Sequence, residues 1–201
     1  MIEKKAGLWS SATGHRQAMR DIPIAAAMGI IAGCAASAIR LHLGIPGHKA
    51  ILWMPIVIAC RLLSGCRIGA TVGSLSAAAA AYACGGNLAG DMTALPLIAV
   101  TGAVLDYFAA MAQRYRSIWF ILPIVATGAM IANMICLTKR LWLPLLVGNH
   151  GLSGYSELIY RILSYAVCGL VAGVAGVVLY VLASKCRHRM NSKKNSPSDT
   201  A

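Results

Sequence analysis

Six apolar stretches separated by short polar segments constrain the fold of this chain more than any other feature. A membrane-spanning helix needs about 20 mostly apolar residues. Hydrophobic residues make up 58% of the 201 residues and charged residues only 12%, too few charges to cover a water-soluble sphere of this size. The sequence therefore predicts an all-α membrane protein, a bundle of six transmembrane helices. The expected spans are 22–39, 50–63, 68–84, 93–111, 118–137 and 162–183.

The second span and the two ends of the chain differ from the other predicted segments in length or composition. The second span is short and contains Pro55, which removes a helix hydrogen bond and favours a kink. Residues 1–21 carry charges of both signs, and we expect them to form a cytoplasmic segment ahead of the spans. Residues 184–201 are polar and basic, with too few apolar side chains to pack, and we expect a disordered cytoplasmic tail there.

Lysine and arginine are distributed unequally between the two sides that six crossings create. Short loops rich in these residues stay in the cytoplasm. Thirteen basic residues fall on the side that holds both termini and five on the other, which together account for all 18. We therefore expect both termini in the cytoplasm and a multi-pass protein of the cell membrane. Because the basic residues lie at the ends of apolar stretches, the net charge of +12 indicates topology and not a nucleic-acid partner.

The first span carries small residues at helical spacing, which lets two helices approach closely in lipid. Ala25, Gly29 and Gly33 recur every four residues, and Ala32 and Ala36 form a second row. Packing inside the bundle explains such a pattern, and so does a surface that docks a second membrane protein. Both interpretations stay open, and the docking surface would consist of these five residues.

Asp106 is the one acidic residue well inside an apolar stretch, where an unpaired carboxylate is costly. It lies near the cytoplasmic end of the fourth span, within reach of Arg61, Arg67 or Arg114. The sequence favours a structural ion pair at the membrane boundary over a proton-relay or catalytic role.

Polar and aromatic residues gather in the segments expected on the outer side. Apolar walls with a few polar groups are typical of a small-molecule pocket, and rings that line the lipid headgroup region are the alternative. The histidines are not paired at metal-ligand spacing on one helix, so no metal or other cofactor is expected. The candidate substrate-binding residues are His42, His48, Lys49, Trp53, Asn87, Asn149, His150 and Tyr155.

Two short stretches carry a more specific pattern. Residues 65–73 read Gly-Cys-Arg-Ile-Gly-Ala-Thr-Val-Gly, and residues 102–106 read Gly-Ala-Val-Leu-Asp. They resemble the Gly-x-Arg-x-Gly-Ala-x-x-Gly and Gly-x-x-x-Asp runs of the substrate-binding S components of energy-coupling-factor (ECF) vitamin transporters. The resemblance implies a non-catalytic six-helix subunit that captures a vitamin or vitamin precursor outside. It also implies docking through helix one to a membrane coupling subunit, and inward delivery driven by ATP-binding subunits.

Two other function classes stay open. One is a small membrane enzyme acting on a lipid or isoprenoid, with Asp106 or the histidines as acid or base. The chain has no Asp-x-x-Asp pair, which disfavours that enzyme. The other is a ligand-free assembly partner, which the aromatic residues of the outer segments disfavour. No phosphate-binding loop occurs in the sequence, so any pumping requires a partner's ATPase.

Overall fold

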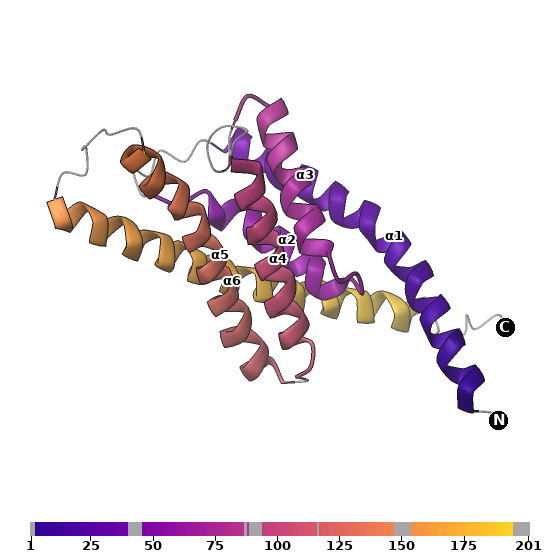
Figure 1. Cartoon of the computed structure of the whole chain (residues 1–201). Coiled ribbons are helices and arrows are strands. Elements are labelled where there is room, and N and C mark those ends of the chain that lie inside the picture. Colours follow the sequence, from indigo (N-terminus) through magenta and orange to yellow (C-terminus); the bar gives the residue numbers. More distant parts are fainter. Residues whose placement is uncertain are drawn as a thin grey trace.

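The computed structural model describes the backbone of residues 3–39, 46–86, 88, 94–115, 117–146 and 154–194. Within these residues all regular structure is helical, and six helices follow one another along the chain (Figure 1). They are α1 (Glu3–Ala38), α2 (Ala50–Leu63), α3 (Gly69–Ala83), α4 (Leu95–Ala112), α5 (Ile118–Leu146) and α6 (Gly154–Lys194).

The short helix α2 lies at the centre of the bundle. It packs against α6, α1, α3 and α4, while the outer helices contact one another in the order α1, α3, α4, α5 and α6. Ten of its 14 residues are buried, including Trp53, Met54 and Arg61. A helix that is apolar all round belongs in a protein interior, and one of 10–14 residues more often forms a core helix than a span. This explains why the second apolar stretch is short.

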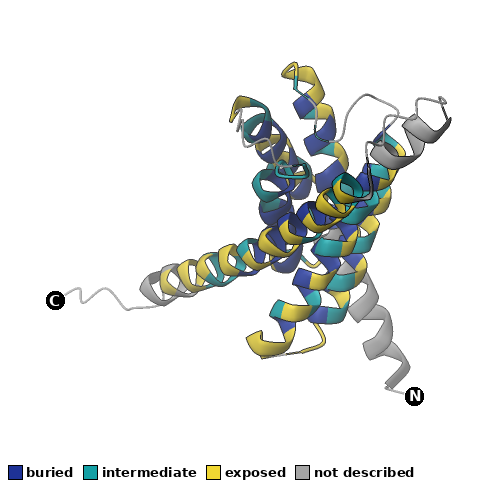
Figure 2. Ribbon diagram, turned by 90° about the vertical axis from the view of Figure 1, so that its left-hand side faces the viewer, coloured by how far each residue is buried: buried dark blue, intermediate teal, exposed yellow. Residues whose placement is uncertain are grey.

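In the described part of the chain four helices are long and apolar enough to cross a membrane, through their segments Arg20–Ala38, Leu95–Ala112, Ile118–Thr138 and Ser156–Arg187. Their outward faces carry exposed isoleucine, leucine and valine side chains, such as Ile31 on α1 and Leu163 on α6. Contiguous apolar surface of this kind is unfavourable in water and favourable in lipid. The helices therefore indicate a membrane protein. Figure 2 shows the buried residues concentrated where the helices cross.

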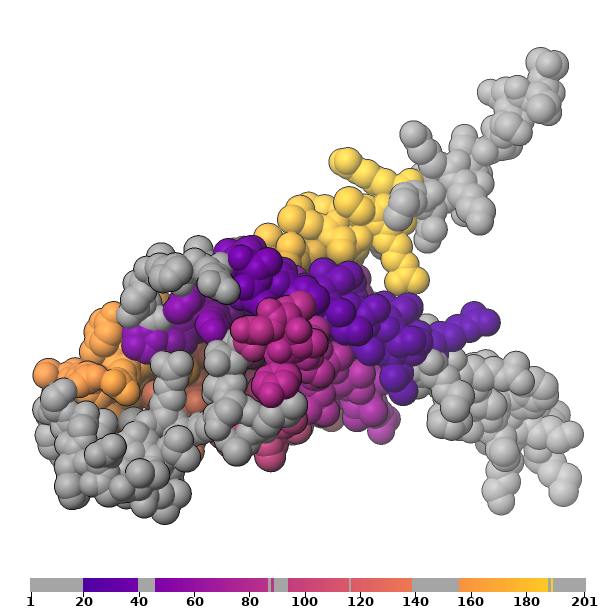
Figure 3. Space-filling view, turned by 90° about the horizontal axis from the view of Figure 1, so that it is seen from above, coloured from indigo at the N-terminus to yellow at the C-terminus, as the bar shows by residue number. Residues whose placement is uncertain are grey.

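Three helices, α1, α5 and α6, extend well beyond the spans that the sequence predicts. α1 continues back to Glu3 through Pro23, although an acidic residue followed by proline is a typical helix start. α5 continues to Leu146, beyond the expected end at 137. α6 begins at Gly154 and continues to Lys194, so residues 184–194 are helical where a disordered tail was expected. Lysine and arginine are good helix formers, which lets a helix continue after its apolar face has ended. Figure 3 shows the C-terminal part of α6 projecting from the body of the bundle.

Candidate functional site

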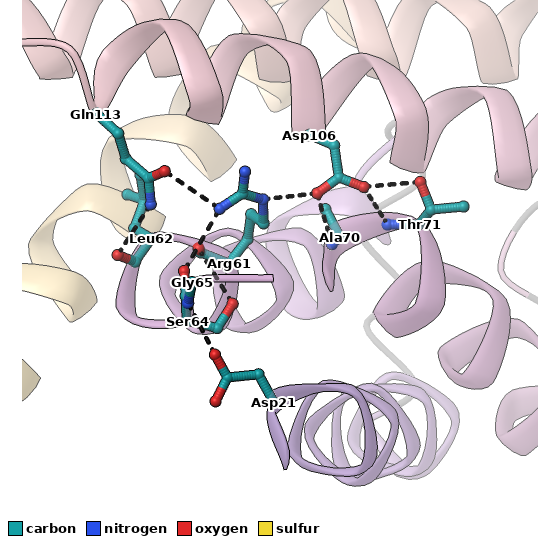
Figure 4. A network of polar contacts seen from close by, with 9 residues as sticks. All are labelled: Asp21, Arg61, Leu62, Ser64, Gly65, Ala70, Thr71, Asp106 and Gln113. Carbon is teal, nitrogen blue, oxygen red and sulfur yellow. Dashed lines mark hydrogen bonds and ion pairs between the residues drawn. The ribbon is translucent and has the colours of Figure 1, made fainter. Parts of the chain in front are cut away.

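Successive helices run in alternating directions, so the bundle has two chemically different ends. At one end the last turn of α2, the first turn of α3 and the later half of α4 meet in a network of hydrogen bonds (Figure 4). We call this the polar network. At the other end the starts of α2 and α4, the later half of α5 and the first half of α6 surround a cavity.

Asp106 of α4 is the centre of the polar network. Its Oδ1 accepts hydrogen bonds from Arg61 Nε at 2.7 Å and from the backbone N–H of Ala70 at 2.9 Å. Its Oδ2 accepts bonds from the backbone N–H and the hydroxyl of Thr71, at 2.8 and 2.7 Å. The first N–H groups of a helix have no partner within the helix, and Ile68 at the N-cap of α3 offers no side-chain bond. Asp106 therefore caps α3 from a neighbouring helix.

Arg61 and Gln113 extend the network to the end of α2. Arg61 Nη1 lies 3.4 Å from Gln113 Oε1 and 3.5 Å from the carbonyl oxygen of Ser64, and Gln113 Nε2 donates to the carbonyl of Leu62 at 3.4 Å. These carbonyls belong to the last turn of α2 and the residue after it, where oxygen atoms lack helical donors. A cationic side chain there also complements the helix dipole.

The network has a structural role. Arg61 is 2% exposed, and both carboxylate oxygens of Asp106 are hydrogen-bonded. A buried charge of this kind needs its partner and its hydrogen bonds. Of the three arginines expected within reach, Arg61 makes the ion pair with Asp106, whereas Arg67 and Arg114 are exposed. The predicted Arg67 contact is therefore not part of the pair.

The cavity at the opposite end has a volume of about 60 Å³. Buried Trp53 and Tyr165 supply aromatic walls, and His48, Lys49 and Asn133 supply polar groups. Of the eight residues that the sequence proposed for substrate binding, it contains His48, Lys49 and Trp53. The full lining is Gly47, His48, Lys49, Ala50, Trp53, Leu88, Ile98, Asn133, Cys136 and Tyr165.

The turn before α2 is fixed onto α6, which sets the shape of the cavity. Ser164 Oγ donates to the carbonyl of Pro46 at 2.6 Å. Gly47 has φ +82°, and a Cβ there would lie 3.0 Å from the ring of Tyr165. Only glycine combines this backbone conformation with so close a ring. The turn therefore presents the next residue, His48, to the cavity.

Asn133 is a polar cavity residue that the sequence reasoning missed. It is buried in α5, and its Nδ2 donates to the backbone carbonyl of Tyr165 at 2.7 Å. A polar amide inside an apolar span is costly and often functional. The position of Asn133 within the predicted span 118–137 could therefore have marked it as a candidate binding residue. Tyr165 and Cys136 give no comparable signal, because both residue types are common in apolar helices.

The other predicted binding residues cannot be placed in the cavity. His42, Asn87, Asn149 and His150 lie outside the described residues. Tyr155 belongs to the first turn of α6, and its side chain lies outside the described ones. Among the described residues no group of three or more His, Cys, Asp or Glu is placed to hold a metal ion.

The small residues of α1 face the interior of the bundle. A Cβ at Gly29 would lie 2.2 Å from the carbonyl oxygen of Gly73, and one at Gly33 would lie 2.1 Å from that of Ala77. Both carbonyls belong to α3, and Ala25, Ala32 and Ala36 are buried as well. The small residues of α1 therefore pack within the chain, and this face of α1 is not free to dock a partner. The docking interpretation of these five residues is corrected accordingly.

Comparisons of the chain with protein-family models, with curated proteins and with solved structures find no match.

Proposed function

We propose that this chain is the substrate-binding membrane subunit of an ECF-type importer, and that it binds a small micronutrient in the cavity between α2, α4, α5 and α6. The observation that carries the proposal is the composition of this cavity. A solute would meet the aromatic faces of Trp53 and Tyr165, together with an imidazole, an amine and an amide. Apolar walls supply affinity and a few placed polar groups supply orientation.

The distribution of charge supports a membrane orientation in which the cavity faces outward. Arg20, Arg67 and Arg114 are exposed at the polar-network end, and the exposed Lys185 and Arg187 of α6 lie toward it. Basic residues of this density mark the cytoplasmic side. All six helices would then cross the membrane or its core, with both termini inside.

Aromatic residues support a membrane boundary at the polar-network end. Tyr115 and Phe120 stack at 5.5 Å between ring centroids, and neighbouring Trp119 is 83% exposed. Amphipathic rings are enriched at the membrane–water interface. α2 is about 21 Å long at 1.5 Å per residue, shorter than a hydrocarbon core of about 30 Å. The cavity at the start of α2 would therefore lie below the outer surface of the bilayer.

The aromatic walls of the cavity favour a solute with a flat or apolar portion. Catalysis is not part of this proposal, because the one buried carboxylate of the spans described, Asp106, lies at the other end of the bundle and is fully hydrogen-bonded.

The test is to purify the full chain from its native membrane and to identify co-purifying small molecules and subunits by mass spectrometry. A bound solute should be lost or weakened at least about tenfold in Trp53→Phe and in His48→Ala, which corresponds to about 1.4 kcal/mol. Trp119→Phe, the same substitution at the opposite end, should leave binding unchanged. The proposal fails if no solute and no ATP-binding subunit associate with the chain, or if the Trp119 variant binds as weakly as the Trp53 variant.

A further inference from the structure

Two cysteines that lie 50 positions apart in the sequence meet at the cavity end of the bundle. Cys34 belongs to α1 and Cys84 follows the last residue of α3, and their sulfur atoms are 3.5 Å apart. Cys34 is half-buried and Cys84 is exposed. The remaining five cysteines, all within the described residues, make no comparable sulfur–sulfur contact.

The backbones that carry these thiols are held close together by the packing of α1 on α3. The Gly33–Ala77 contact brings the two helices within backbone distance one residue before Cys34. One turn further, Ser37 Oγ donates to the carbonyl of Ala81 at 3.3 Å, and a Cβ at Gly86 would lie 2.5 Å from the same hydroxyl. Cys84, directly after α3, therefore lies between two residues, Ala81 and Gly86, that both contact Ser37 of α1.

This geometry suits a covalent bond. A disulfide needs Cβ atoms about 3.5–4.5 Å apart and a sulfur–sulfur bond of about 2.05 Å. The sulfur atoms of Cys34 and Cys84 lie 3.5 Å apart, so formation of the bond requires them to approach by about 1.5 Å. The exposed thiol of Cys84 is the one that an oxidant can reach first, and Cys34 lies beside it to complete the bond.

We propose that Cys34 and Cys84 form a reversible disulfide when the chain meets a disulfide-type oxidant such as oxidised glutathione. The Cys84 thiolate attacks one sulfur of the oxidant, and the first thiol leaves. The Cys34 thiolate then attacks the Cys84 sulfur of the mixed disulfide, and the second thiol leaves. The two protein thiols are oxidised by two electrons in total, the oxidant is reduced to two thiols, and each proton lost by a cysteine ends on a released thiol.

The bond would join α1 to the end of α3, just before the segment that contains Leu88 of the cavity wall. It would therefore fix one side of the cavity relative to α1. In the orientation proposed above this end faces the outside, where disulfides persist. The chemistry itself rests on the Cys34–Cys84 geometry alone and does not require the transport function.

The experiment exposes the purified, reduced full chain in detergent to oxidised glutathione, blocks the remaining thiols with an alkylating reagent, and analyses the chain by mass spectrometry. We expect two of the seven thiols to be lost together, a peptide linked through Cys34 and Cys84, and full recovery with dithiothreitol. Cys186→Ser, which removes an exposed cysteine elsewhere, should lose the same two thiols.

Cys34→Ser and Cys84→Ser distinguish an internal bond from general thiol reactivity. In each variant the linked peptide should be absent, and the single cysteine left at the site should carry at most a glutathione adduct. Equal adducts on Cys34, Cys84 and Cys186 of the unaltered chain, without the linked peptide, would overturn the proposal. So would a linked peptide that joins either residue to another cysteine.

Discussion

The polar network predicts that its two charged residues contribute unequally to stability. Asp106→Leu removes the acceptor of Arg61 Nε and also the cap of α3. Breaking a buried pair and leaving the other charge costs about 3–5 kcal/mol, and losing a helix N-cap costs about 1 kcal/mol. We therefore expect a loss of about 4–6 kcal/mol in the free energy of unfolding.

Arg61→Met should cost less, although it breaks the same ion pair. The carboxylate of Asp106 keeps the two backbone N–H donors and the Thr71 hydroxyl, and it stays at the positive end of the α3 dipole. Arg61, by contrast, keeps only the longer contacts with Ser64 and Gln113 once Asp106 is gone. We expect Arg61→Met to cost about 2–3 kcal/mol.

Unfolding by sodium dodecyl sulfate in mixed micelles, followed by circular dichroism, measures both losses. The double variant Arg61→Met/Asp106→Leu completes the cycle, and its cost should be smaller than the sum of the single costs because no unpaired charge remains. If Arg61→Met destabilises the protein as much as Asp106→Leu, Asp106 is not the centre of the network. If the two costs simply add, the residues do not interact.

Three further predictions concern the packing of α1 on α3, the Thr71 bond of the polar network, and the amide of Asn133. Gly33→Val places a side chain against the Ala77 carbonyl of α3. It should lower the free energy of unfolding by about 3 kcal/mol or prevent assembly. The control Ala27→Val, on the exposed face of α1, should change the free energy of unfolding by less than about 0.5 kcal/mol. Equal effects of the two would contradict the α1–α3 packing. Thr71→Val removes one of four bonds to Asp106 and should lower the unfolding free energy by about 1 kcal/mol; a neutral result would argue against that bond. Asn133→Leu should cost a similar amount and should also weaken solute binding, and unchanged binding would exclude its amide from the site.

The number of helices and the bounds of the central ones could be predicted from the sequence, because each apolar run is bounded by glycine, proline or charged residues. The predicted 50–63 coincides with α2, and 93–111 differs from α4 by two residues at its start and one at its end. The ends of α1 and α6 could not be predicted in the same way. Beyond the apolar runs these two helices continue through polar residues, and hydropathy there carries no information on where a helix stops.

The site was predictable only in part, because the same local sequence pattern can pack against different neighbouring elements. Small residues at Gly29 and Gly33 allow close approach to any helix, inside the chain or outside it. Whether they pack inside the chain or against a partner depends on where α3 lies, and the position of α3 depends on the whole fold. The choice of Arg61 as the partner of Asp106 depends likewise on which face α2 turns toward α4. His48 and Trp53, by contrast, could be proposed because they lie next to a turn that begins an apolar stretch.

The cap of α3 has a consequence for biosynthesis. Asp106 lies 36 positions after Ala70 and 35 after Thr71, so α3 is synthesised before the residue that caps it. α3 has 15 residues, many of them alanine and glycine, and without Asp106 the N–H groups of its first turn have no side-chain cap. We therefore expect α3 to be inserted stably only together with α4, as a helical hairpin. A chain truncated after α3 but before Asp106 should therefore hold α3 in the membrane less stably than the full chain does.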